Sequence, residues 1–172
     1  PNGVGYVDLN AGNSAGEHVL PESAHLGPHG LVAFLDYDKG MAYAKQVNKP
    51  VLLDFTGHAC VNCRKMEEKV WSDPAVLSVL KNEVVLISLY VDDKRELPKD
   101  EQYFSEITGK NIKSIGNKWS EFQIKKYQAN AQPYYVLLDH NGENLNEHSA
   151  YNPNINDYLT WLKEGINNFK NP

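Results

Sequence analysis

Cysteine is scarce in this 172-residue chain, which contains only two, at positions 60 and 63. Two cysteines cannot build a disulfide-rich scaffold, a four-cysteine zinc site or an iron–sulfur cluster. No apolar run approaches the roughly 20 residues that a membrane-spanning helix needs. Basic residues are too few to favour nucleic acid, because 17 lysines and arginines face 22 aspartates and glutamates, a net charge of −5. What remains is the composition of a globular protein about one domain long.

The first 30 residues contain six glycines and neither lysine nor arginine. We expect residues 1–30 to be an extended, glycine-rich arm or linker, and residues 31–172 to be the folded domain. The chain opens on proline and shows no signal-peptide pattern, which predicts a piece processed or cut from a longer protein.

Hydrophobic patterning predicts an order of strands and helices for the domain. Strands are expected at residues 31–35, 51–55, 84–91 and 134–139, with a hairpin partner for the last at 144–149. Helices are expected at residues 37–47, 60–70, 118–128 and 155–169, with a restart at the Asp73-Pro74 cap. The long connection at 92–115 has little pattern, and we expect a short helix within it at 101–108. This order predicts an α/β fold with a mixed central sheet flanked by helices.

The two cysteines form one Cys-x-x-Cys motif at the predicted start of a helix. First-turn N–H groups stabilise a thiolate, so we expect Cys60 to attack a partner disulfide and Cys63 to resolve the resulting mixed disulfide. Zinc would need two further ligands, and covalent haem attachment would need histidine where Arg64 stands. Zinc binding and a purely structural disulfide stay open beside redox chemistry. We expect no metal and no cofactor other than the Cys60–Cys63 disulfide itself.

Two carboxylates are candidates for proton transfer at these thiols. Asp54 interrupts an apolar strand six residues before Cys60, where burial would raise its pKa and suit it to exchange a proton with Cys63. Its alternative is a strand-end residue turned to solvent. Glu67 follows Cys63 by four residues on the same helix face, either as a second proton handler or as a solvated partner of neighbouring basic residues. Both anions would oppose thiolate formation at Cys60.

Pro133 precedes the strand predicted at residue 134, within the segment Gln132-Pro133-Tyr134. Proline fits the first position of a strand because it cannot donate to the ladder of the sheet. A cis bond before Pro133 would place a backbone edge beside the dithiol, where an extended substrate segment can pair. We therefore expect Gln132, Pro133 and Tyr134 to bind the substrate.

Three segments resemble the thioredoxin superfamily in sequence and in order: Val51-Leu52-Leu53-Asp54-Phe55, the Cys60–Cys63 motif, and Gln132-Pro133-Tyr134. The closer resemblance is to the C-terminal domain of the thiol:disulfide interchange protein DsbD family, over about residues 31–170. Its marks are Lys49-Pro50, Cys-Val-x-Cys before a basic residue, Met66-Glu67, and Trp71-Ser72-Asp73-Pro74-Ala75-Val76. The chain departs from the family at residues 57–59, where an aromatic residue commonly precedes the first cysteine, and in the longer connection at 92–115.

The resemblance implies a thioredoxin-like fold with a cis Pro133 and a long insertion after the second core strand. It implies that Cys60 is the nucleophile, Cys63 the resolving thiol, and Asp54 and Glu67 acidic modulators. The chain would be a protein-disulfide reductase domain on the periplasmic side of a bacterial inner membrane. Electrons would come from cytoplasmic thioredoxin through an upstream membrane-embedded redox domain and pass to periplasmic partners, in cytochrome c biogenesis and cell redox homeostasis.

Two alternatives to this reductase remain. One is a stand-alone periplasmic thioredoxin-like oxidoreductase, including one tuned toward oxidation. The other is a non-catalytic thioredoxin-fold binding module that docks a partner through its aromatic residues, although aromatics at such positions more often belong to a core. These residues are Tyr103, Phe104, Trp119, Phe122 and Tyr127. For the fragment itself we expect a monomer.

Overall fold

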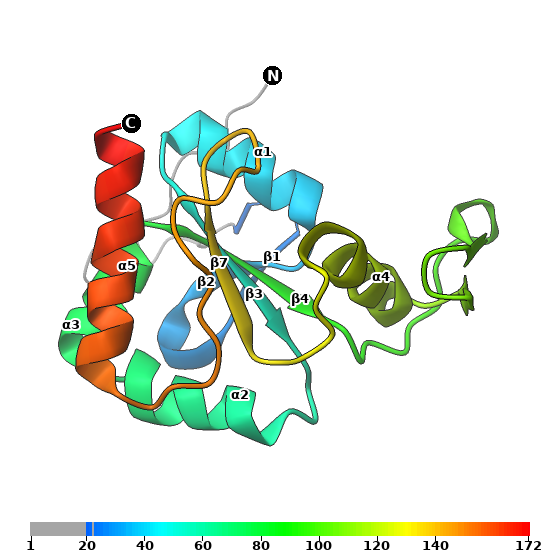
Figure 1. Ribbon diagram of the computed structural model, residues 1–172, viewed down its shortest axis with the longest axis horizontal. Helices are drawn as coiled ribbons and strands as arrows, with labels where there is room; N and C mark the ends of the chain where they lie inside the picture. Colours follow the sequence, from blue (N-terminus) through cyan, green and yellow to red (C-terminus); the bar gives the residue numbers. More distant parts are fainter. Residues whose placement is uncertain (1–19, 22) are drawn as a thin grey trace.

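The computed structural model describes residues 20, 21 and 23–172. At its centre is a five-stranded sheet with strand order β1-β2-β4-β3-β7 (Figure 1). Its strands are β1 (Ala24–Leu26), β2 (Val32–Phe34), β3 (Val51–Thr56), β4 (Val85–Tyr90) and β7 (Tyr134–Leu138). Strands β2, β4 and β3 run parallel, whereas β1 and β7 pair antiparallel at the two edges. The mixed sheet expected from the sequence is therefore confirmed.

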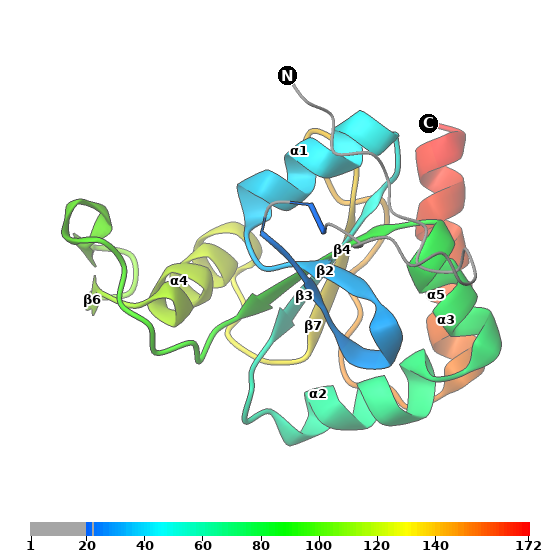
Figure 2. The same cartoon turned by 180° about the vertical axis from the view of Figure 1, so that it is seen from behind.

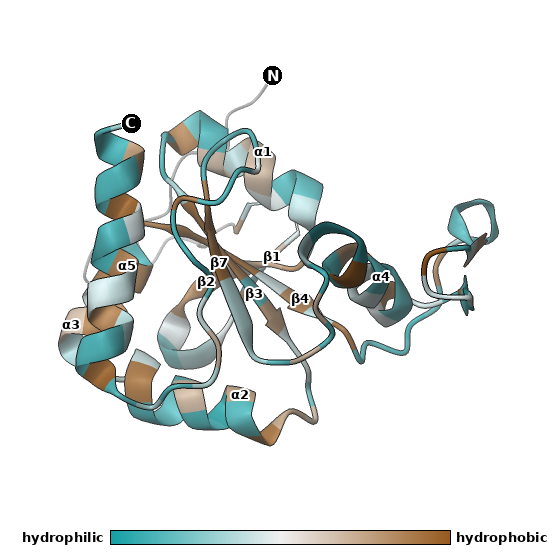
Figure 3. Ribbon diagram, viewed as in Figure 1, coloured by the Kyte–Doolittle hydropathy of each residue, from teal (hydrophilic) through white to brown (hydrophobic). Residues whose placement is uncertain are grey.

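Helices cover both faces of this sheet (Figures 1 and 2). One face carries α1 (Tyr37–Val47) and α4 (Ile115–Tyr127). The other carries α2 (Val61–Met66), its π-helical continuation η2 (Glu67–Trp71), α3 (Pro74–Asn82) and α5 (Ile155–Lys170). Side chains alternate along a strand, so Leu53 and Phe55 of β3 face α1 and α4 while Leu52 faces the other helices. Two apolar cores result, one on each side of the sheet. Figure 3 shows hydrophobic residues along the strands between them.

Capping side chains visible in the sequence fix where the helices begin. Asp36 accepts a hydrogen bond from the Lys39 N–H at 3.0 Å, and α1 covers the residues predicted for it. Asp73 caps α3 in the same way and is followed by a proline in the first turn. Helix α4 begins at residue 115 rather than 118, because Ser114 and Asn117 form a reciprocal capping box.

The short helix predicted at residues 101–108 is wrong. A 3-10 turn, η3 (Lys99–Glu101), is followed instead by a hairpin of β5 (Tyr103–Ser105) and β6 (Lys110–Ile112). Its turn uses Gly109 at φ +69°, a left-handed conformation that favours glycine, and the Ser105 hydroxyl accepts from the Thr108 N–H. These local turn contacts outweigh the weak helical pattern.

The strand predicted at residues 144–149 does not form either. This segment lies beside β7 but makes only isolated bridges, at Asn144 and Ser149. Its centre is bonded to α5 instead, since Asn146 donates to the Trp161 carbonyl and the Trp161 indole donates to the Glu147 carbonyl. Contacts with the helix thus replace the ladder of a regular hairpin.

The sheet begins earlier than the domain boundary expected at residue 31. Strand β1 and the 3-10 turn η1 (Pro28–Gly30) fall within the segment assigned to the arm, and β1 pairs with β2 from Ala24 opposite Phe34 to Leu26 opposite Val32. Within the predicted arm, residues 1–19 and 22 lie outside the described residues. Among the residues described, no helix combines the length and apolar character that crossing a bilayer requires.

Gly116 allows α4 to approach the backbone that follows β4. A Cβ at this position would lie 2.6 Å from the Val91 carbonyl oxygen and 2.7 Å from the Asp93 nitrogen. Because both obstacles are backbone, we expect Gly116→Ala to lower the free energy of unfolding by about 1–3 kcal/mol in denaturant titrations. The control Lys125→Ala changes an exposed residue of the same helix and should shift stability by less than about 0.5 kcal/mol. Equal stability of the two variants would contradict this close approach.

Candidate redox site

The dithiol lies at the amino end of α2. Cys60 is the N-cap of this helix and forms a disulfide with Cys63, whose N–H donates to the Cys60 sulfur at 3.2 Å. Cys60 is partly exposed, whereas Cys63 is only 1% exposed. A partner can therefore reach the outer sulfur and not the inner one, which is the asymmetry that nucleophile and resolving thiol require.

The loop before Cys60 is held by a carboxylate from the loop after β4. Asp92 accepts hydrogen bonds from the His58 N–H at 2.8 Å and the Ala59 N–H at 2.9 Å. Partial burial acts to raise the pKa of Asp92, but these backbone bonds outweigh burial and lower it. The His58 ring stacks on Tyr90, with ring centroids 4.0 Å apart. The chain thus has a fixed loop and a histidine stack at the position where the resembled family commonly has an aromatic residue beside the cysteine.

A strip of polar side chains lies on the sheet beneath α2. Asp54 and Thr56 point to the same face of β3 because they are two residues apart. Their partners in register on β4 are Ser88 and Tyr90. Asp54 is 2% exposed and accepts a hydrogen bond from the Ser88 hydroxyl at 3.1 Å. The burial predicted for Asp54 is therefore observed.

Glu67 faces this strip from the junction of α2 and η2. The Arg64 guanidinium donates through Nη2 to the Glu67 carboxylate at 2.8 Å and to the Thr56 hydroxyl at 3.1 Å. The Glu67 carbonyl accepts from Nε2 of His29, at 2.7 Å. Because Glu67 is only 9% exposed, it is a largely buried partner of Arg64 and not the solvated one that the sequence left open.

Burial and mutual repulsion set the protonation of the two carboxylates. Burial raises the pKa of Asp54 to about 7, with a further increase from Glu67 and a partial decrease from Ser88 and Arg64. Burial also raises the pKa of Glu67, while the bond from Arg64 opposes the increase. A carboxyl group that titrates near neutrality can both accept and return a proton at physiological pH.

The third predicted segment lies at the amino end of β7, beside the carboxyl end of β3. The Gln132–Pro133 peptide bond is cis, as the resemblance implied, and Tyr134 pairs with Phe55. The Gln132 side chain donates to Gln123 of α4, and the Tyr134 ring stacks on His148 at 4.5 Å. Both side chains are therefore engaged within the protein. A substrate-binding role for residues 132–134 stays a prediction and would rest on their backbone groups.

Comparison with known proteins agrees with this geometry. The family model described as a thioredoxin-like domain matches residues 37–166. The chain belongs to this family. DsbD of Vibrio vulnificus (strain CMCP6) is 48% identical over 46 residues, covering 27% of the chain and 8% of that protein. DsbD of Klebsiella pneumoniae is 32% identical over 85 residues, covering 49% of the chain and 13% of that protein. These alignments thus span only a small part of the curated relatives.

Solved structures show the same fold. The structure titled DsbH oxidoreductase has a TM-score of 0.57 at 19% identity and covers 91% of this chain and 95% of its own. The reduced C-terminal domain of DsbD from Neisseria meningitidis has a TM-score of 0.53 at 15% identity, covering 74% and 92%. Fold, family and disulfide together make this chain a thiol:disulfide oxidoreductase domain of the thioredoxin-like family.

Sequence reasoning missed several residues of this thioredoxin-like site. Thr56, Ser88 and Tyr90 are polar residues inside apolar strands. Thr56 follows Asp54 by two residues and Tyr90 follows Ser88 by two, a spacing that places each pair on one face of its strand and was the available signal. Asp92 and His29 gave no comparable signal, because their contacts join segments 33 to 38 residues apart. Both act on backbone groups of the dithiol region.

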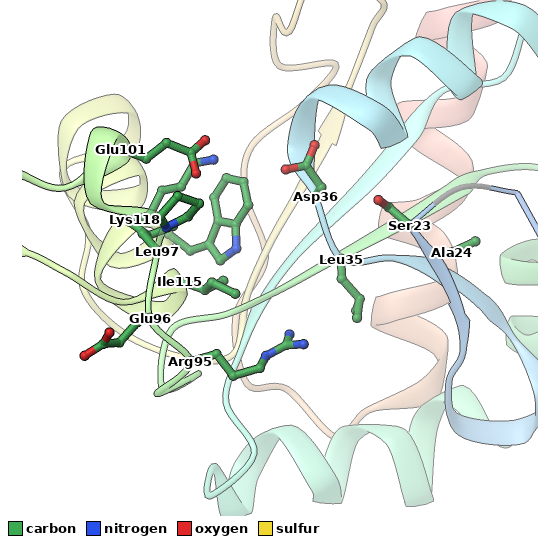
Figure 4. Close-up of a pocket in the computed structure, with 12 residues that line it drawn as sticks. Ser23, Ala24, Leu35, Asp36, Arg95, Glu96, Leu97, Glu101, Ile115 and Lys118 are labelled. Carbon is green, nitrogen blue, oxygen red and sulfur yellow. The ribbon is translucent and has the colours of Figure 1, made fainter.

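A separate cleft of about 420 Å³ lies away from the dithiol network (Figure 4). It separates residues 95–101 and α4 from β1 and the start of α1, and its charged lining residues carry both signs. These charged residues are Asp36, Arg95, Glu96, Glu101 and Lys118. Neither cysteine and neither of the two site carboxylates lines it. Across the described part of the chain, no group of three or more potential ligands is placed to hold a metal ion.

The hairpin β5–β6 belongs to the insertion after β4 and projects from the body of this domain (Figure 2). Three of its apolar side chains are about half exposed or more: Tyr103 at 47%, Phe104 at 59% and Ile107 at 56%. The remaining aromatics considered for docking belong to the core beneath α1 and α4: Trp119, Phe122 and Tyr127. Of these five aromatics, the exposed ones, Tyr103 and Phe104, therefore both lie in the insertion.

Proposed function

We propose that this chain is a protein-disulfide reductase domain that relays electrons by thiol–disulfide exchange. It would receive them from an upstream membrane-embedded redox domain and pass them to partner proteins on the periplasmic side of a bacterial inner membrane. The observation that carries the proposal is the Cys60–Cys63 disulfide at the start of α2, on the same face of the sheet as a buried carboxyl group whose pKa is about 7. Similarity to DsbD proteins supports the membrane donor and the compartment.

The first step uses the exposed thiol. In the reduced form, the Cys60 thiolate attacks one sulfur of the partner disulfide and forms a mixed disulfide. The other partner sulfur leaves with the electron pair of the broken bond and takes up a proton. The position of Cys60 as N-cap of α2 places its sulfur at the amino end of the helix, where N–H groups favour the thiolate.

The second step needs a base for the buried thiol. Asp54 in its ionised form accepts the proton of Cys63, and the Cys63 thiolate attacks the Cys60 sulfur. The Cys60–Cys63 disulfide forms, and the second partner sulfur leaves as a thiolate that is then protonated. Two electrons and two protons have passed to the partner, and a dithiol donor reverses the sequence to reduce the chain again.

The charges around the dithiol support the reductive direction. Strong oxidants of this fold owe their potential to a stabilised reduced form, in which the thiolate is favoured. Here the carboxylates of Asp54 and Glu67 disfavour additional negative charge and so favour the disulfide. We therefore expect a reduction potential nearer to thioredoxin, at about −270 mV, than to DsbA, at about −120 mV.

Trapping of the mixed disulfide tests the proposal. The Cys63→Ser variant lacks the resolving thiol, so with insulin as disulfide probe it should accumulate a covalent adduct through Cys60 that a reductant dissolves. The double variant Cys60→Ser with Cys63→Ser serves as the control and should form none. A Cys63→Ser protein that forms no adduct, while the unaltered protein reduces insulin, would refute the assigned order of attack.

The exposed hairpin favours a second candidate, a binding module that docks a partner without turnover. Tyr103 and Phe104 would supply contact area for such a partner. The double variant Cys60→Ser with Cys63→Ser distinguishes the two candidates. If the chain is a binding module, this variant should keep full biological function. If the chain is a reductase, the variant should lose that function.

A further inference from the structure

We propose that Arg64 is a positioning residue of the dithiol site, which keeps Glu67 ionised beside Asp54 and so leaves the exchangeable proton on Asp54. This inference deepens the proposed function and rests on it for its catalytic meaning.

The guanidinium of Arg64 connects η2 to the sheet. It bonds the Glu67 carboxylate at 2.8 Å and the Thr56 hydroxyl of β3 at 3.1 Å, and its charge also acts on Tyr90 of β4. Thr56 and Tyr90 face each other in register, so their hydroxyls lie on one side of the sheet. Arg64 therefore fixes the end of α2 over the polar strip that begins at Asp54.

This ion pair differs from an ordinary surface pair. The Arg64 side chain is 35% exposed, but that of Glu67 is only 12% exposed. A carboxylate with so little access to water depends on its bonded partner to remain ionised. Glu67 is also held at its carbonyl by His29, so two separate contacts fix this residue.

Among the charged groups that face the two carboxylates, Arg64 has the largest role in keeping them ionised. Asp54 faces Ser88, Arg64 and Glu67, and its charge also acts on three tyrosine hydroxyls, those of Tyr90, Tyr135 and Tyr158. Glu67 faces Arg64, His29 and Glu68. Arg64 is thus the basic side chain that acts on both members of the pair, whereas His29 acts on Glu67.

Removal of Arg64 changes which carboxyl group holds the proton. Two close carboxyl groups titrate as a pair, and the second charge is costly to form while the first is present. With Arg64 in place, Glu67 takes the charge and Asp54 titrates near neutrality. Without the guanidinium, both groups hold protons more tightly and share one charge, and the base needed by Cys63 is present less often.

Four variants test this assignment: Arg64→Gln, the conservative Arg64→Lys, Glu67→Gln, and the matched control Lys65→Gln. Lys65 is the exposed basic neighbour in the same helix, so its loss removes the same charge outside the network. The readouts are carboxyl ¹³C NMR titration of the oxidised protein and the pH profile of mixed-disulfide resolution with insulin.

We expect Arg64→Gln to raise both apparent pKa values of the Asp54–Glu67 pair and to move the pH profile upward. The rate at which the mixed disulfide is resolved at pH 7 should fall on the order of tenfold. This is less than the roughly 10²- to 10⁴-fold that general acid–base catalysis supplies, because the base is still present part of the time. Arg64→Lys should restore part of the rate, because an ammonium keeps the charge but lacks the planar fork. Glu67→Gln should lower the pKa of Asp54. Adding Arg64→Gln to it should then move the profile upward by less than Arg64→Gln does alone, because only the direct effect of Arg64 on Asp54 is lost.

Two results would overturn the assignment. One is an Arg64→Gln protein whose pair titrates as in the unaltered chain, which would leave Arg64 a packing role. The other is an equal change in Lys65→Gln, which would show a general effect of net charge. Should Arg64→Gln not fold, Arg64→Lys and Glu67→Gln decide the question by the same titration. Failure of the proposed function would be recognised separately. An unaltered chain that does not reduce insulin would refute the reductase proposal, whereas the NMR titration of the Asp54–Glu67 pair would still test the role of Arg64.

Discussion

Replacing Cys60 with serine is expected to lower the rate of disulfide exchange by at least about 10³-fold, close to the uncatalysed background. A hydroxyl is a far weaker nucleophile than a thiolate at neutral pH. Cys63 cannot take over the attack, because it is only 1% exposed and a protein disulfide cannot approach its sulfur. Insulin reduction with a dithiol donor in excess measures this loss.

The control for this experiment changes the same tetrapeptide without removing sulfur. Val61 lies between the cysteines and is 66% exposed, so Val61→Ser should fold normally and keep the rate within a few-fold. Residual turnover above a tenth of the original rate in Cys60→Ser would contradict the assignment of Cys60 as nucleophile. Equal losses in both variants would point instead to disruption of the helix end.

The sequence was sufficient for the central strands and for the core of the site. From Val51 to Phe55, strand β3 is apolar except for Asp54, and a carboxyl group in such a run is costly unless it has a partner. That energetic argument predicted the burial of Asp54. Helical spacing likewise placed Glu67 on the same side as Cys63.

Contacts that depend on strand register could not be predicted in this way. Ser88 lies opposite Asp54 only because β3 and β4 pair in a particular register, which no local pattern specifies. The bond from His29 to Glu67 was missed because residue 29 was assigned to the arm. The hairpin around Gly109 was missed because turn contacts, rather than periodicity, decide its structure.

The second large effect concerns stability. Replacing Asp54 with asparagine is expected to raise the free energy of unfolding by about 4 kcal/mol above pH 8, because folding raises the pKa of Asp54 from its ordinary value of 3.8 to about 7. Asparagine is nearly the same size and can still accept the bond from Ser88. The same variant should slow mixed-disulfide resolution, since it has no base for Cys63.

The sign of this effect follows from where the proton is held. Between pH 4 and pH 7 the folded chain keeps a proton on Asp54 that the unfolded chain has already released, so rising pH removes stability across this window. Below the window both states are protonated, and the advantage of Asp54→Asn should vanish. Denaturant titrations at about pH 4, 6 and 8 measure the trend. The control Asp100→Asn alters an exposed carboxylate and should show no such growth with pH. A pH-independent gain in Asp54→Asn would indicate improved packing rather than relief of a buried charge.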